Sequence, residues 1–144
     1  MLKSEFRQWI IQEKIGLLTK CELIQLADNY ITEHEAFPIW MTKISLNESL
    51  EGESSLDLTL EKVNDIDCKN IANILLKLHK NGSIERQKLG CVADKLYPLL
   101  DEDCEAYDFF MWVSDEVDLI NSGYDSKTDF DAHIEKSLGE LSAL

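Results

Sequence analysis

Hydrophobic residues recur along most of this chain with the spacing of one face of a helix. A clear example follows residue 19, where the apolar positions are Leu23, Leu26, Ala27, Tyr30 and Ile31. Intervals of three and four residues place such side chains on one helical face. Six glycines and two prolines leave few turns between these segments. The pattern predicts an all-α fold, a single helical domain over residues 1–144 built as a bundle or helical-hairpin stack of six to seven helices.

The N-terminal part of the chain carries clear helix boundary signals. A first helix is expected over residues 5–15, with Ser4 as its N-cap and Gly16 at its end. The run from Thr19 to Glu22 has the spacing of a capping box, so a second helix should begin there and end before Pro38.

Pro38 suits the first turn of a short third helix that runs to about Ser45. Residues 46–55 read as a polar loop. The following segment, LDLTLEKVND, shows some alternation, which fits a strand or the end of a helix equally well.

Two helices are expected between residues 65 and 98. The segment CKNIANILLKLHK should form the first, capped by Asp65 or Asp67 and closed by Asn81-Gly82. Ser83 is the expected cap of the next helix, which Pro98 ends or kinks. Its inward positions should be Ile84, Leu89, Val92 and Leu96.

Two further helices are expected to complete the chain. Asp101 or Asp103 should open a long helix that runs to about Asn121. Thr128 should cap the last helix, whose inward residues would be Phe130, Ile134, Leu138 and Leu141.

Negative charge is concentrated in the last third of the chain. The formal net charge is -14, and residues 101–144 hold 13 acids against 2 bases. Such a field repels nucleic acid and anionic membranes and speeds encounter with basic proteins, although it also serves solubility. Neither nucleic acid nor a membrane is therefore expected as a partner.

Familiar catalytic and metal-binding patterns fail at specific positions. His34-Glu35 starts like the HExxH zinc motif, but Pro38 stands where the second histidine should be. A calcium loop beginning at Asp101 would need its glycine at Ala106 and its glutamate at Trp112. We therefore predict no metal site, no cofactor and no catalytic residue. An enzyme remains the alternative only if carboxylates converge in a helical pocket.

The cysteines and the N-terminal sequence indicate a cytoplasmic setting. None of the four cysteines forms a CxxC pair, so free thiols in a reducing compartment are expected. The first residues, MLKSEFRQWIIQEK, interrupt their apolar positions with charge and do not form a secretion signal.

The helix expected up to Asn121 has two distinct sides. With 100° per residue and Phe110 as the reference, its core stripe contains Ala106, Tyr107, Val113, Ser114 and Val117. The opposite side, here called the acidic face, consists of Glu105, Asp108, Trp112, Asp115, Glu116 and Leu119.

Trp112 in the acidic face has two interpretations. It could pack, together with Leu119, on a second element such as the first or last helix. Alternatively, it is an interface anchor whose rim of carboxylates steers a partner rich in lysine and arginine. The second interpretation predicts that Trp112→Ala and Asp115→Lys weaken binding and leave thermal stability nearly unchanged.

Residues 9–45 resemble the opening of small, acidic bacterial immunity proteins that neutralise secreted or contact-dependent toxins. The similar elements, mostly a turn, a cap and core positions, are Trp9, Ile15-Gly16-Leu17, Glu22-Leu23, Ala27-Asp28, Pro38, Trp40 and Ile44-Ser45. The resemblance implies a cytoplasmic inhibitor, without catalytic residues, that binds one toxin domain, often a nuclease.

Charge and resemblance lead to the same expectation. Nucleases must bind phosphate and tend to be basic, so an acidic partner can cover their substrate surface. We expect an immunity protein that neutralises a basic toxin domain through the acidic face. The alternative is an acidic helical adaptor or regulator that binds another basic protein.

Overall fold

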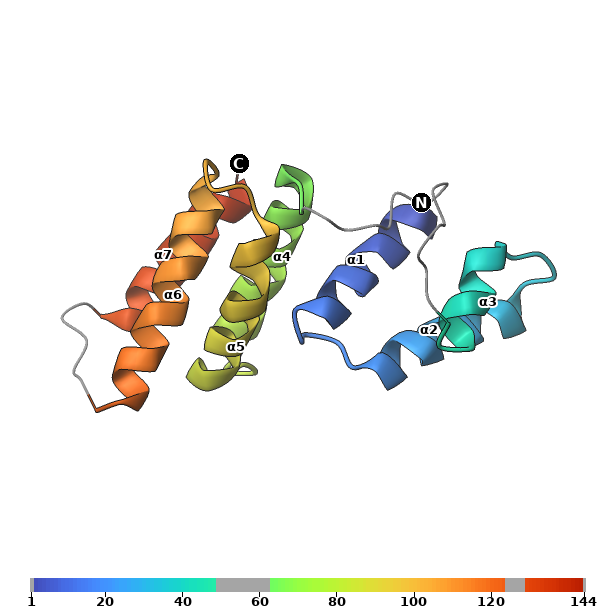
Figure 1. The fold of residues 1–144 in the computed structure, drawn as a ribbon, viewed down its shortest axis with the longest axis horizontal. Coiled ribbons are helices and arrows are strands. Elements are labelled where there is room, and N and C mark those ends of the chain that lie inside the picture. The colour runs from blue at the N-terminus through green and yellow to red at the C-terminus, as the bar shows by residue number, and fades with distance from the viewer. Residues whose placement is uncertain (1, 49–62, 124–128, 144) are drawn as a thin grey trace. The chain divides into compact units, whose positions relative to one another are not determined.

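The computed structural model describes residues 2–48, 63–123 and 129–143, and these residues form an all-α structure (Figure 1). The described residues contain no strand, which confirms the all-α prediction. The α-helices are α1 (Leu2–Lys14), α2 (Lys20–Glu33), α3 (Ile39–Ser45), α4 (Asp65–Lys80), α5 (Arg86–Leu96), α6 (Glu105–Asn121) and α7 (Phe130–Ala143), with a 3-10 turn η2 (Tyr97–Leu99) after α5.

The chain divides into two compact units, Met1–Glu61 and Lys62–Leu144. The N-terminal unit contains α1 to α3, and the C-terminal unit contains α4 to α7. Each unit has buried hydrophobic residues of its own. The expectation of a single domain over residues 1–144 stays a prediction. Residues 56–62 of the segment LDLTLEKVND and most of the expected loop 46–55 lie outside the described residues, whereas Asn64 and Asp65 at the end of that segment belong to the start of α4.

The ends of the helices in the N-terminal unit follow from local backbone chemistry. α1 ends where Gly16 adopts a φ of 86°, which lets Leu17 N–H donate to the Gln12 carbonyl at 2.8 Å. Ser4 lies inside α1, so its prediction as the N-cap was wrong. The Thr19–Glu22 capping box is confirmed, with reciprocal bonds of 3.1 and 3.2 Å.

Aromatic residues organise the core of the N-terminal unit. The Phe6 ring meets the Trp9 and Trp40 rings edge to face, at centroid distances of 4.8 and 5.1 Å. Ser45 at the end of α3 donates a hydrogen bond to Asp28 on α2. The residues in the resemblance to immunity proteins thus build the turn, cap and core of this unit.

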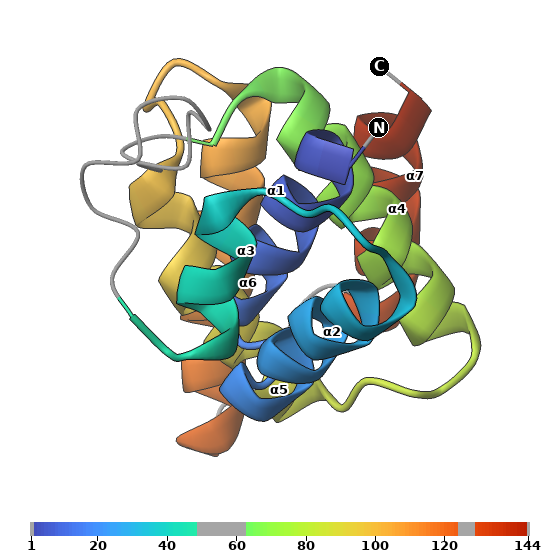
Figure 2. The ribbon, with the colours of Figure 1, turned by 90° about the vertical axis from the view of Figure 1, so that its right-hand side faces the viewer.

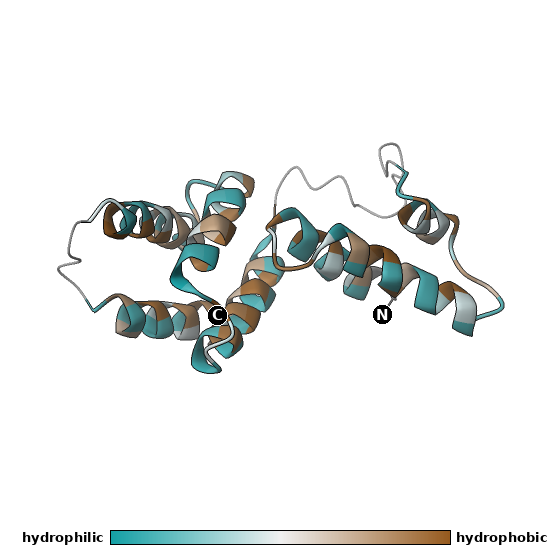
Figure 3. Cartoon of the chain, turned by 90° about the horizontal axis from the view of Figure 1, so that it is seen from below, coloured by the Kyte–Doolittle hydropathy of each residue, from teal (hydrophilic) through white to brown (hydrophobic). Residues whose placement is uncertain are grey.

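The C-terminal unit is a four-helix arrangement in which α4 packs beside α7 and α5 beside α6 (Figure 2). Apolar residues gather on one side of these helices and polar residues on the other (Figure 3). The four inward residues predicted for the last helix are all buried in α7: Phe130, Ile134, Leu138 and Leu141.

Two predicted helix caps in this unit were wrong. α4 is capped by Asn64, whose side-chain oxygen accepts from Asp67 N–H at 2.9 Å while Asp67 accepts from Asn64 N–H at 3.0 Å. Ser83 does not cap α5, which begins at Arg86. The Ser83 N–H instead donates to the Leu78 carbonyl at the end of α4, at 2.8 Å.

The start of α6 also differs from the prediction. The helix begins at Glu105 after Cys104, which makes no side-chain cap bond, rather than at Asp101 or Asp103. Thr128 lies outside the described residues. In the first turn of α7, Asp129 Oδ1 accepts from Ala132 N–H at 3.3 Å.

Candidate functional site: the acidic face of α6

The acidic face lies on one continuous helix. α6 runs unbroken from Glu105 to Asn121, so its six residues repeat at intervals of three and four on one side. The opposite side carries the core, where Ala106, Phe110, Val113, Ser114 and Val117 are buried. Tyr107, predicted for the core stripe, is half-buried and meets the Tyr97 ring edge to face at 5.7 Å. The periodicity therefore predicted the buried side of α6, with Tyr107 at its edge.

Trp112 is half-buried and packs against α7. Its ring stacks on Phe130 at a centroid distance of 5.8 Å and lies 4.3 Å from the His133 ring. Phe109 adds a third aromatic contact at 6.3 Å. We call Phe109, Trp112, Phe130 and His133 the aromatic cluster. These contacts match the interpretation in which Trp112 packs on the last helix, whereas Leu119 remains 47% exposed.

Charged groups on α4 and α5 contact α7 beside the aromatic cluster. The Arg86 guanidinium at the start of α5 lies 4.9 Å from the centroid of the Phe130 ring. Arg86 also approaches Asp131 at 3.9 Å. His79 on α4 lies 3.4 Å from Asp131 and 3.2 Å from Glu135 of α7. Three helices therefore hold the surface against which Trp112 packs.

The carboxylates of the acidic face differ in their surroundings. Glu105, Asp108 and Asp115 are exposed, and Glu116 is half-buried. Among the described residues, no ion pair joins a basic group to Glu105, Asp108 or Asp115. α6 contains no basic residue, so its exposed carboxylates meet no opposite charge within their own helix. A cationic partner would relieve this unfavourable electrostatic arrangement.

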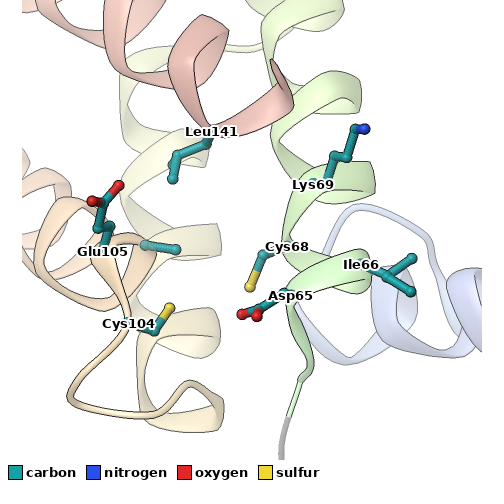
Figure 4. A pocket seen from close by; sticks show the side chains of 8 residues that line it. Asp65, Ile66, Cys68, Lys69, Cys104, Glu105 and Leu141 are labelled. Carbon is teal, nitrogen blue, oxygen red and sulfur yellow. The ribbon is translucent and has the colours of Figure 1, made fainter. Parts of the chain in front are cut away.

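A pocket of about 540 Å³ opens at the end of the C-terminal unit where α4 and α6 begin and α7 ends (Figure 4). Its lining residues are Asp65, Ile66, Cys68, Lys69, Cys104, Glu105, Ala106 and Leu141. Glu105 belongs to both the pocket and the acidic face. Sequence reasoning assigned Asp65 to a helix cap and missed the pocket, because the pocket depends on which helix ends meet in space.

The pocket contains a thiol that stays protonated. Burial, together with the nearby Cys104, Asp65 and Asp67, raises the pKa of Cys68 to about 12. A thiol with so high a pKa is a poor nucleophile at neutral pH. The exposed cysteines are Cys21 and Cys91.

Within residues 2–48, 63–123 and 129–143, no group of three or more His, Cys, Asp or Glu side chains is placed to hold a metal ion. None of the described helices has the length and apolar character needed to span a membrane.

The comparisons with known proteins return nothing for this chain. No protein-family model matches the sequence, and neither the curated proteins nor the solved structures contain a match.

Proposed function

We propose that this chain is an immunity protein that binds and neutralises a basic bacterial toxin domain of the nuclease kind. One observation carries the proposal: exposed carboxylates without described ion pairs surround a tryptophan that is held in place by α7. The resemblance of residues 9–45 to small acidic immunity proteins supports the same function.

The geometry of Trp112 favours binding to another protein. Its ring is partly accessible, and its contacts with Phe130 and His133 restrict its rotamers before any partner arrives. Binding therefore costs little side-chain entropy at this position. Tryptophan is among the commonest interface hot spots, and a charged rim around it accelerates encounter with an oppositely charged partner.

The mechanism that follows is stoichiometric and needs no catalysis. A nuclease domain presents lysine and arginine to bind phosphate groups. Glu105, Asp108 and Asp115 would pair with such residues and keep nucleic acid out. An adaptor that binds a different basic protein would use the same face, so the identity of the partner decides between the two functions.

The test begins with the genes beside the one for this chain, because the immunity function requires that one of them encode a toxin domain. The toxin domain is produced with the wild-type chain, with Asp115→Lys, and with Glu140→Lys as the control. Glu140 is exposed near the end of α7 and is not one of the six residues of the acidic face, so its replacement changes the net charge equally without altering that face.

We expect Asp115→Lys to weaken toxin binding by roughly 10- to 100-fold and to abolish protection of the host cell. Glu140→Lys should stay within about threefold of the wild type, because it changes only long-range attraction. Equal protection by both variants would exclude the acidic face. Absence of any effect of the wild-type chain on the toxin would favour the adaptor function.

A further inference from the structure

We infer that the pocket at the end of the C-terminal unit takes a lysine or arginine side chain of the basic partner. This inference rests on the proposed function and identifies a second contact beside Trp112. It is carried by three features of the pocket: its apolar wall, its two lining carboxylates and its position on α6.

The walls of the pocket suit the aliphatic part of a basic side chain. Ala106 and Leu141 are buried and provide hydrocarbon surface from α6 and α7. Cys68 and Cys104 provide weakly polar thiols from the starts of α4 and α6 (Figure 4). A volume of about 540 Å³ falls within the usual range of ligand pockets and leaves ample room for one long side chain.

Two carboxylates belong to the lining of this apolar surface, one on each wall. Figure 4 shows the Asp65 carboxylate on the α4 wall directed across the pocket toward the start of α6, whereas the Glu105 carboxylate on the α6 wall and the Lys69 ammonium group are both turned away from Asp65. Within the part of the chain that the structure describes, no ion pair occupies either carboxylate. A cationic head group beside Asp65 would gain a charge-assisted hydrogen bond that the free protein lacks, and the nearby negative charge of Glu105 would add to the attraction.

The charged residues in the segments around the pocket are also mainly acidic. Segments 65–67 and 101–108 contain seven carboxylates in total, and Lys69 is the base nearest to them in sequence. The N-termini of α4 and α6 contribute only about half a positive charge each. Their combined contribution does not cancel the carboxylates, so the pocket favours a cation over an anion.

Glu105 connects the pocket to the acidic face. A rise of 1.5 Å per residue separates Glu105 from Trp112 by about 10 Å along α6. A partner with one basic residue in the pocket and another over Trp112 would therefore span this distance. Asp108 lies between them on the same side of the helix and can contact the intervening segment.

The test measures binding of a single basic side chain by the full chain. Nα-acetyl-lysine methylamide is titrated into the ¹⁵N-labelled protein and amide shifts are followed at residues 65–69, 104–106 and 141. The neutral control is Nα-acetyl-norleucine methylamide, which has the same stem without the ammonium group. Glu105→Gln and Asp65→Asn each remove one of the lining charges, and Asp115→Asn removes a charge from the acidic face outside the pocket.

We expect saturable shifts in the pocket with the lysine amide and no saturation with the norleucine amide. Affinity should fall by about three- to fivefold in Glu105→Gln and in Asp65→Asn, and should be unchanged in Asp115→Asn. The unliganded spectra of the variants establish that each is folded.

Two results would overturn the inference. Equal binding of both amides would make the pocket an apolar groove without preference for a cation, and unsaturated shifts with both would leave it without a basic occupant. The proposed function fails separately, through normal toxin binding by Asp115→Lys, because Asp115 lies outside the pocket.

Discussion

The rings of Trp112 and His133 lie 4.3 Å apart and join α6 to α7. α7 packs chiefly against α4, and α6 packs chiefly against α5. The aromatic cluster therefore connects the two helix pairs at the surface of the C-terminal unit. Trp112 contributes to the fold with one part of its ring and leaves the rest accessible to a partner.

This arrangement changes what is expected of Trp112→Ala. Full truncation of a buried tryptophan costs about 3–5 kcal/mol, and a half-buried ring should cost about 2 kcal/mol. Urea unfolding measures this change in the free energy of unfolding. Trp112→Phe keeps a ring against Phe130 and should lose less than about 1 kcal/mol. A stable Trp112→Ala variant would mean that the ring does not pack on α7 in solution.

Asp115→Lys should weaken toxin binding without lowering the free energy of unfolding. Asp115 is exposed in the second half of α6, and a lysine there would lie one helical turn before Asp118. We expect the free energy of unfolding to stay within about 0.5 kcal/mol of the wild-type value, while toxin binding falls. Thermal unfolding alongside the binding measurement checks both parts. A fall in stability of more than about 1 kcal/mol would show that Asp115 has a structural role.

The sequence predicted the helices better than it predicted their caps. Periodicity fixes a helix because burial of one face is repeated over many residues, as in α7 and α6. A cap depends on one or two hydrogen bonds, and several nearby side chains can compete for them. Asn64, Asp65 and Asp67 all suit the start of α4, and only the backbone geometry selects Asn64.

In the candidate site, too, the sequence did not predict contacts that depend on how different helices pack. Helical spacing put Trp112 and Asp115 on one side of α6 without further information. It could not tell which neighbouring helix covers part of Trp112, because α7 reaches it through contacts with residues more than 15 positions away in sequence. The pocket was missed for the same reason, since Asp65, Cys104 and Leu141 meet only after the bundle has formed.

Gly90 should be essential for close packing of α5 on α6. A Cβ atom at this position would stand 2.7 Å from Val117 Cγ1 and 2.9 Å from Val117 Cβ. Alanine favours a helix by about 1 kcal/mol over glycine, but overpacking costs about 1–3 kcal/mol. We expect Gly90→Ala to lower the free energy of unfolding by about 1–2 kcal/mol.

Two variants make the Gly90 prediction specific. Gly139 in α7 has no atom within 4 Å of an added Cβ, so Gly139→Ala should stabilise the protein by about 0.5–1 kcal/mol. Val117→Ala removes Cγ1, the atom nearest to the new Cβ, but keeps the Val117 Cβ atom at 2.9 Å, so the clash is relieved in part and the double variant Gly90→Ala/Val117→Ala should be more stable than the sum of the single changes. Additive losses would show that the methyl groups of Val117 do not cause the clash.

Cys68 should resist alkylation in the folded protein. Its pKa of about 12 keeps the thiol protonated at pH 8, whereas Cys21 and Cys91 are exposed. Iodoacetamide followed by peptide mass spectrometry should modify Cys21 and Cys91 within minutes and leave Cys68 unmodified until urea unfolds the chain. Modification of Cys68 at the rate of Cys21 would contradict its burial.

The same thiol makes stability depend on pH above 9. The folded pKa of Cys68 is raised from 9.0 to about 12, so the unfolded chain loses this proton first as the pH rises. The contribution of Cys68 is therefore fully present below pH 9 and is lost between pH 9 and 12, by at most about 1.4 kcal/mol per pH unit. Urea unfolding from pH 8 to 10.5 measures this slope, and Cys68→Ala supplies the slope of all other groups. The wild-type free energy of unfolding should fall more steeply than that of Cys68→Ala, and parallel curves would show that the folded thiol titrates as it does in the unfolded chain.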